Sequence, residues 1–399
     1  MHGDVANLSC RPMRFTGPAE FCIHIIDSIE FAHELPNIEP TRGKFMYFNE
    51  LDNESRQRLI DVQQRGVAFR VVQADLKRRF AGSMTWRARS GRDYLYRRTG
   101  RIDKALGPRS PETEAIHAAF TQGKASAEQR ETGLRQTLEG MARVNRAMGL
   151  GRVPRVVGRI LRRLDEAGVL GEQVRVVGTN ALFAYKAHAG IRFDRGLLAT
   201  ADVDLALDAR RNLGLAAEAM PRGLLGLLRK VDPSFAPQAE GAFPAVNASG
   251  FMVDLITAEP RDRMTVAPRR QRRLGGGPDI GNIEDVEAVE VPRLEMIVDA
   301  PRFTATAVSE DRLPVWIAAA DPRWWAAHKL WLASEPSRDP LKRQRDRDQG
   351  KAVATMLSQV WGEVDVSDEA LASIPAEARR DLRTEIARGT TDGDHRAEW

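Results

Sequence analysis

The sequence has few of the residues that build covalent or zinc-bound scaffolds. Cys10 and Cys22 are the only cysteines among its 399 residues. Two thiols supply neither a disulfide framework nor a cysteine-based zinc site. His188 and His328 stand at no metal-ligand spacing from another histidine or cysteine, so they provide no zinc site either. These shortages exclude disulfide-rich and zinc-binding folds.

The sequence also lacks long apolar runs. It contains no stretch of about 18 apolar residues, which is the length that a membrane-spanning helix needs. The N-terminus does not show the basic segment followed by an apolar one that is typical of a secretion signal. We therefore expect a soluble, cytoplasmic protein with no membrane partner.

Charge of neither sign dominates the composition. The 60 Lys and Arg residues slightly outnumber the 55 Asp and Glu residues, for a net charge of +5. This balance permits binding of nucleotides or nucleic acid, but an ordinary solvated surface has the same composition. Hydrophobic residues make up 42% of the chain, which is enough for buried cores. The length suggests roughly two or three domains.

The predicted fold class is α+β. For the central part we expect a mixed, strongly twisted sheet of about four or five strands backed by helices. The predicted units, in order, are an N-terminal region 1–150 with a disordered start, a core 151–300, a C-terminal helical domain 301–389 and a tail 390–399.

Local patterns predict the elements of the N-terminal region. Over 53–77 the apolar rhythm indicates a helix followed by a strand or a second helix. Segment 82–98 has two aromatic-containing runs around a central Ser-Gly pair, which is typical of a β-hairpin. Ser110, followed by proline and two glutamates, marks the start of a helix. We expect this helix to be interrupted near Gly123.

Further along the chain, the patterns predict a core and a helical end. The core strands are predicted at 174–178 and 199–208, with two more in 243–257 joined at 248–250. The core helices are predicted at 157–168, 180–189 and 210–230. Trp324, Trp325 and Trp331 stand at helical spacing, which favours a packed helix face over a base-stacking surface. The basic, Gly-rich segment 267–279 could contact phosphates, but we favour a mobile surface loop.

Two acids interrupt one of the predicted strands. In "ATADVDLALD", residues 199–208, Asp202 and Asp204 alternate with apolar residues and point to the same face of the strand. Burying unpaired carboxylates costs several kcal/mol, so a partner should neutralise them. Magnesium fits this need, because it prefers carboxylate and phosphate oxygens. The alternative is that Asp202 and Asp204 form salt bridges at a strand end, near Arg210 or Arg211.

Three further features point toward phosphate chemistry. The strand "VRVVG" leads through Gly178-Thr179 into a helix, a junction where free N–H groups and a hydroxyl can hold phosphate. Thr179 could instead only cap the helix. "FMVDLIT" places Asp254 inside another apolar strand as the third acid of a two-metal site, or as a buried, hydrogen-bonded acid. Basic residues follow in segment 328–348.

These basic residues supply candidate phosphate contacts. Lys329, Lys342 and Arg345, with the neighbouring Arg343, could neutralise a triphosphate. The run from Arg343 to Asp348 could equally be a solvated helix face.

The order of these motifs resembles the nucleotidyltransferase superfamily of the DNA polymerase β type. That superfamily has a Gly-[Gly/Ser] pair at a helix start, Asp-x-[Asp/Glu] on the next strand and a third acid on a later strand. "VVGTNALFAYKAHAGIRF", "LLATADVDLALDAR", "GSMTWRARSGRDYLYRR" and "LGPRSPETE" are similar to a bacterial group with this fold. "HKLWL" with the later "PLKRQRDRDQG" also resembles the basic motif of type IV abortive-infection toxins.

The resemblance covers roughly residues 80–360 and carries two departures. Thr179 replaces the usual Ser or Gly but keeps a hydroxyl, and the segment between Thr179 and Asp202 is longer than in compact members. The resemblance implies that Asp202, Asp204 and Asp254 bind metal and that Gly178 and Thr179 hold the triphosphate. It also implies that one of the downstream basic residues contacts phosphate or substrate.

We therefore expect an enzyme that uses a nucleoside triphosphate, such as ATP, and two Mg²⁺ ions. It would transfer a nucleoside monophosphate to a hydroxyl of RNA, a protein or a small molecule. The Arg- and Ala-rich composition favours a bacterial source. The alternative is a nucleotide-binding module without turnover that docks nucleic acid or a partner protein. Either could serve in a toxin–antitoxin or phage-defence system.

Overall fold

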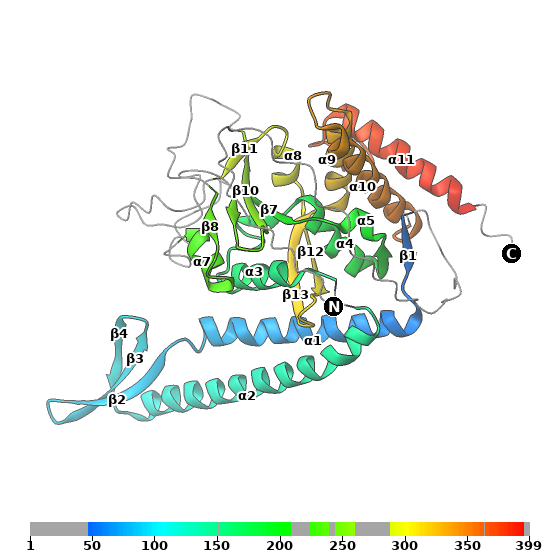
Figure 1. Ribbon diagram of the computed structural model, residues 1–399. Helices are drawn as coiled ribbons and strands as arrows, with labels where there is room; N and C mark the ends of the chain where they lie inside the picture. The colour runs from blue at the N-terminus through cyan, green and yellow to red at the C-terminus, as the bar shows by residue number, and fades with distance from the viewer. Residues whose placement is uncertain are drawn as a thin grey trace, which may run out of the picture. The chain divides into compact units, whose positions relative to one another are not determined.

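A computed structural model describes residues 47–150, 152–208, 223–238, 244–259, 288–362 and 364–394. All of these residues belong to one compact unit of the chain. Figure 1 shows helices and sheets mixed along the chain, as expected for the α+β class. None of the helices in the described residues is long and apolar enough to cross a membrane.

The central sheet is mixed and wider than the sequence indicated. In the described residues it has eight strands in the order β12-β13-β5-β7-β10-β9-β8, with β11 also paired to β10. Its neighbours β5 and β7 are antiparallel, whereas β7 and β10 are parallel. The strands are β5 (Val174–Val176), β7 (Asp202–Leu207), β8 (Ala236–Pro237), β9 (Ala245–Val246), β10 (Met252–Ala258), β11 (Val289–Val291), β12 (Arg302–Val308) and β13 (Pro314–Ala320).

Our prediction of four or five strands was too low, and β12 and β13 are the main reason. They form an antiparallel hairpin inside segment 301–389, which we predicted to be helical. The last four residues of β13, "IAAA", are all buried, so their pattern lacks the alternation that marks a half-exposed strand. The division of the chain into 1–150, 151–300 and 301–389 stays a prediction.

The strand pair β7 and β10 is held in the core by its alternate residues. Val203 and Leu205 on β7, and Val253 and Leu255 on β10, are fully buried. The intervening positions Asp202, Asp204 and Asp254 are only partly buried. The period-two pattern predicted from "ATADVDLALD" is therefore confirmed as a strand with two unlike faces.

Helices pack around this sheet and against one another. The core helices include α3 (Arg155–Glu166), the 3-10 helix η1 (Gly178–Ala181), α4 (Leu182–Ala189), α5 (Arg195–Leu198), α7 (Gly223–Val231) and α8 (Glu295–Val298). The C-terminal helices are α9 (Pro322–Ser334), α10 (Pro340–Gln359) and α11 (Ala376–Asp394). On α9, Trp324 and Trp325 are buried, which confirms that the tryptophan pattern is a packed helix face.

The N-terminal part contains a pair of long helices and a small sheet (Figure 1). Helix α1 (Asn53–Arg78) is one continuous helix, not a helix followed by a second element. Helix α2 (Pro111–Ala147) begins at the predicted Ser110 cap but continues without interruption through Gly123. A Cβ at Gly123 would lie 2.7 Å from the Phe80 ring, so this glycine allows close packing and does not end the helix.

The predicted hairpin is confirmed and gains a third strand. β2 (Ser83–Arg89) pairs with β3 (Arg92–Thr99), and β4 (Ile102–Pro108) completes an antiparallel sheet that we did not predict. Ser90 and Gly91 both have positive φ, as a two-residue hairpin turn requires. A short strand β1 (Phe48–Glu50) pairs with β6 (Ile191–Phe193).

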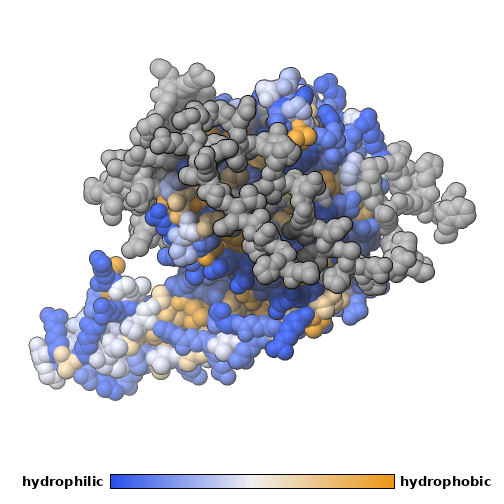
Figure 2. Space-filling view, in the orientation of Figure 1, coloured by the Kyte–Doolittle hydropathy of each residue, from blue (hydrophilic) through white to orange (hydrophobic). Residues whose placement is uncertain are grey.

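The visible surface is largely hydrophilic, with apolar side chains along α1 and α2 (Figure 2). Exposed large apolar residues of these helices are Ile60, Val67, Val71, Ile116 and Val144. Several predictions fall outside the described residues, namely the start of the chain with both cysteines, the first half of helix 210–230, the basic segment 267–279 and residues 395–399.

Candidate active site

Three carboxylates meet on neighbouring strands of the central sheet. Asp202 and Asp204 lie on β7, and the parallel register places Asp254 of β10 directly beside Asp204. One carboxylate oxygen from each of the three lies within 4.8 Å of the others. In the part of the chain that the structure describes, no other group of three acidic, histidine or cysteine side chains could hold a metal ion. The structure thus brings the three predicted acids together.

The crowding of the carboxylates raises the pKa of Asp204 and of Asp254. Burial, together with the negative charges of Asp202 and Asp254, raises the pKa of Asp204 to about 6. Burial and the charge of Asp202 likewise raise the pKa of Asp254. Like charges held this close favour a cation between them. Three carboxylates are also the donor set that a hard divalent ion such as Mg²⁺ prefers, so the residues fit the predicted metal.

The glycine of the Gly-Thr junction lies against this acidic group. Gly178 has φ of +57°, and a Cβ there would lie 2.0 Å from the Oδ2 of Asp204. The backbone N–H of Val177 donates to the carbonyl of Asp204 at 3.0 Å, and the indole of Trp325 donates to the carbonyl of Gly178 at 3.1 Å. Glycine is therefore required here both by its backbone angle and by its closeness to a carboxylate.

Thr179 is buried and links the junction to helix α10. Its hydroxyl oxygen accepts hydrogen bonds from the guanidinium of Arg345 at 2.9 Å and from the amide of Gln349 at 3.0 Å. The N-cap position of η1 is Val177 and Thr179 lies inside this helix, so the alternative in which Thr179 only caps the helix is wrong. With two donors already bound to the oxygen, the hydroxyl proton is available for an acceptor.

Two amide side chains support the site and were not predicted from the sequence. The amide of Asn180 donates to the carbonyl of Asp202 at 2.8 Å, which fixes the start of β7. Gln349 also donates to the carbonyl of Leu197 at 2.8 Å. Neither residue belongs to a motif with its own chemistry, so no signal in a single sequence marks it.

The predicted cations occupy three different environments. Lys329 is buried, and its Nζ lies 2.6 Å from a carboxylate oxygen of Asp346. Asp346 also pairs with Arg338 at 2.9 Å. The charges of Lys329 and Arg338 lower the pKa of Asp204, opposing the effect of the neighbouring acids. Lys329 therefore acts on the acidic group from within a buried ion network.

Lys342 and Arg345 are more accessible. Lys342 is exposed, and its positive charge acts to lower the pKa of Asp254. It therefore lies on the side of α10 that faces the aspartates. Arg345 donates to Thr179 and also to the backbone carbonyl of Ala199. The hydroxyl of Thr200 donates to the carboxylate of Asp202. The predicted ion pairs with Arg210 or Arg211 fall outside the described residues.

Comparison with known proteins bears directly on this arrangement. A family model described as nucleotidyltransferase matches residues 155–374, which is more than half of the chain. The match includes the three aspartates, the Gly-Thr junction and the basic residues of α9 and α10. Searches of the curated proteins and of the solved structures gave no match. On the strength of the family match, this chain belongs to the nucleotidyltransferase family.

Proposed function

We propose that the protein transfers a nucleoside monophosphate from a nucleoside triphosphate to an acceptor hydroxyl and releases pyrophosphate. The observation that carries this proposal is the group of Asp202, Asp204 and Asp254, with carboxylate oxygens within 4.8 Å of one another, inside the segment that matches the family. Gly178, placed against Asp204, supports the same assignment.

The acids would hold the metal. Asp202 and Asp204 would hold two Mg²⁺ ions jointly, and Asp254 would hold the ion on the acceptor side. When bound, such ions neutralise the triphosphate and activate the attacking hydroxyl. The acceptor oxygen forms a bond to the α-phosphorus while the bond to pyrophosphate breaks, and we assign to Asp254 the receipt of the hydroxyl proton.

The remaining residues would position the nucleotide. We propose that the backbone of Gly178 and the hydroxyl of Thr179 contact the triphosphate. Lys342, which is exposed near Asp254, would contact phosphate directly. Arg345 would do so while also holding Thr179. For Lys329 we propose a longer-range role, because its Nζ is paired with Asp346.

We further propose that the central sheet is a core of the DNA polymerase β type. Its support is the sequence β5, Gly-Thr junction, β7 and β10, with acids on β7 and β10. A bacterial source, the use of ATP and a role in phage defence or a toxin–antitoxin pair belong to the same proposal. The acceptor classes are RNA, a protein side chain and a small molecule.

Labelling in cell extract tests the proposed function. The protein is incubated with each of the four α-labelled triphosphates and extract, with Mg²⁺ or with EDTA. We expect label on one class of acceptor, and release of pyrophosphate, only with Mg²⁺. Calorimetry with the same nucleotides distinguishes the alternative, since tight binding without pyrophosphate release over hours would mean a binding module that does not turn over.

A further inference from the structure

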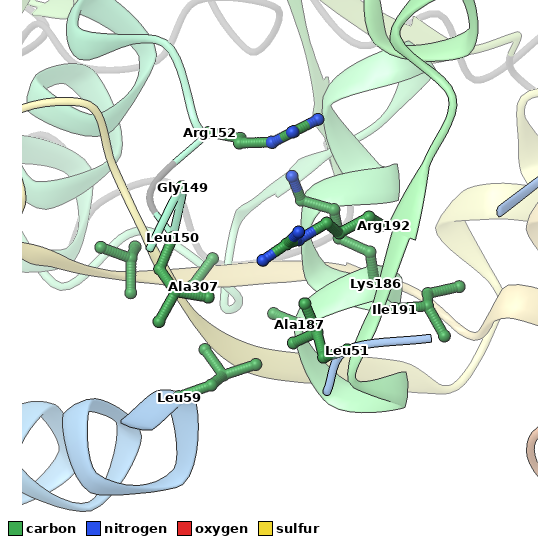
Figure 3. A pocket seen from close by; sticks show the side chains of 11 residues that line it. Leu51, Leu59, Gly149, Leu150, Arg152, Lys186, Ala187, Ile191, Arg192 and Ala307 are labelled. Atoms are coloured by element: carbon green, nitrogen blue, oxygen red, sulfur yellow. The ribbon is translucent and has the colours of Figure 1, made fainter. Parts of the chain in front are cut away.

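A second cluster of like charges lies away from the aspartates, around a cavity of about 40 Å³. Arg152, Lys186 and Arg192 line it together with apolar residues such as Leu51 and Leu150. Figure 3 shows the nitrogen atoms of the three cations gathered on one side of the apolar side chains. Among the residues that the structure describes, no acidic side chain lines this cavity.

Lys186 is the most unusual member of the cluster. It is in the last turn of α4 and only 9% exposed. Its Nζ lies 4.5 Å from the centre of the Phe183 ring, and it forms no hydrogen bond or ion pair with any other residue that the structure describes. Burial and the charges of Arg152 and Arg192 hold its pKa well below the ordinary value. Without an anion nearby the neutral amine is therefore favoured, and a bound anion would favour the ammonium form.

The two arginines leave donors free for such an anion. Arg192 donates through Nη2 to the carbonyl of Met148 at 3.1 Å and to the Ser55 hydroxyl at 3.4 Å. Its Nε is buried and has no partner among the described residues. Burial and the charges of Arg192 and Arg195 lower the pKa of Arg152. The Nε of Arg192 and the guanidinium of Arg152 therefore have no hydrogen-bond or ion-pair partner among the described residues.

One acid lies close enough to be considered as an internal partner. The charge of Arg192 contributes to lowering the pKa of Asp52. However, Asp52 caps helix α1, and its carboxylate accepts from the backbone N–H and the hydroxyl of Ser55. It is exposed and does not line the cavity. Asp52 therefore does not neutralise Lys186.

We propose that this cavity binds a phosphate group, either as inorganic phosphate or as the phosphate of a nucleoside monophosphate. An ammonium and two guanidinium groups are the donors that proteins use for phosphate oxygens. The volume is sufficient for one small oxyanion and too small for a base and sugar, because a single water already needs about 10–15 Å³. A nucleotide would therefore insert its phosphate only.

This site is separate from the proposed nucleotidyl-transfer site. Lys186 follows Gly178 by eight residues through η1 and α4. At the rise of a 3-10 helix followed by an α-helix this corresponds to roughly 14 Å. The phosphate would therefore bind at the other end of α4 from the aspartates, and its binding does not depend on nucleotidyl transfer.

Calorimetry and thermal unfolding with inorganic phosphate test the proposal. Measurements are made in EDTA, so that the aspartates hold no metal, and against chloride at equal ionic strength. We expect phosphate to bind the wild-type chain and raise its unfolding midpoint. Lys186→Met and Arg152→Gln should each weaken phosphate binding by about tenfold or more, since each removes a charged donor.

Arg195→Gln is the matched control, because Arg195 is exposed, is near enough to affect Arg152, and does not line the cavity. It should keep most of the affinity. If Lys186→Met fails to fold, Arg152→Gln decides. If a nucleoside 5′-monophosphate binds and the corresponding nucleoside does not, the ligand is the phosphate of a nucleotide. If only inorganic phosphate binds, the ligand is the free ion. Equal phosphate affinity in wild type and both cavity variants, or none in wild type, overturns the proposal.

Discussion

Two clusters of opposite charge lie toward the two ends of helix α4. Beside its start, three aspartates crowd together on β7 and β10. Near its end, Arg152, Lys186 and Arg192 surround a small cavity. Each cluster consists of like charges that the apolar core holds together, so we expect each to bind a ligand of opposite sign.

A third group of charges shows the contrast. Lys329, Asp346 and Arg338 are also buried or partly buried, but the carboxylate lies between the two cations at 2.6 and 2.9 Å. Both cations of this group therefore have a carboxylate partner within the fold. A carboxylate partner within the fold thus distinguishes Lys329 and Arg338 from the three cations around the cavity. Substitutions in the three groups test this difference, and the largest effect is expected first.

The largest effect is expected from Asp204→Asn. Removing one of three carboxylates should weaken metal binding and lower nucleotide transfer by at least about 10²–10³-fold, the scale of losing one electrostatic contact in a transition state. Steady-state pyrophosphate release measures this loss. Asp194→Asn is the control, because Asp194 is exposed and outside the group. Equal loss in both variants would show that the acidic group has no special role.

Breaking the compensated group should mainly affect stability. Asp346→Asn leaves the buried Lys329 without its carboxylate, and we expect a loss of about 3–5 kcal/mol in the free energy of unfolding. Urea unfolding measures it. Asp348→Asn, two residues further on α10, removes a less buried acid and should cost less than about 1 kcal/mol. Similar values for the two variants would contradict the account.

A side chain at Gly178 should strain the backbone at this position and displace the carboxylate of Asp204. Gly178→Ala adds a Cβ that meets Asp204 at 2.0 Å and also requires positive φ. We expect a stability loss of about 2–3 kcal/mol together with weakened Mg²⁺ binding. Gly168→Ala separates the two causes, since Gly168 has φ of +74° but open space around its Cβ position. That variant should lose only about 1 kcal/mol and keep metal affinity.

The smallest effect has the opposite sign. In phosphate-free buffer Lys186→Met should raise the free energy of unfolding by about 1 kcal/mol, because it replaces a buried amine that has no hydrogen-bond or ion-pair partner among the described residues with an apolar chain of similar length. Urea unfolding of the two proteins checks this. A destabilised variant would mean that Lys186 is already paired in the folded chain, which would contradict the proposed difference between Lys186 and Lys329.

The sequence predicted the acidic site better than the basic one. Alternation in "ATADVDLALD" identified a strand, and the buried Val203 and Leu205 confirm it. The parallel pairing that brings Asp254 beside Asp204 depends on long-range contacts, which the sequence does not show. The sequence did indicate Asp254 as a candidate ligand, because it is an isolated acid in an apolar strand. Lys186 gave no such signal, because a lysine within a helix ordinarily reaches solvent.

The failures in the fold have physical causes. The apolar "IAAA" of β13 is buried on both faces, so its period does not separate strand from helix. Gly123 was expected to interrupt a helix, whereas it allows Phe80 to pack closely. In both cases tertiary packing, and not local sequence preference, determined the secondary structure.

The most direct test of the central claim compares the fate of two phosphates of one triphosphate. The wild-type protein is incubated with Mg²⁺, extract and a triphosphate labelled at either the α- or the γ-phosphorus. We predict that α-label appears on the acceptor and γ-label appears in pyrophosphate, with neither product in EDTA or with Asp204→Asn. Label from the γ-phosphorus on the acceptor, or transfer that persists without the metal or the aspartate, would contradict the account.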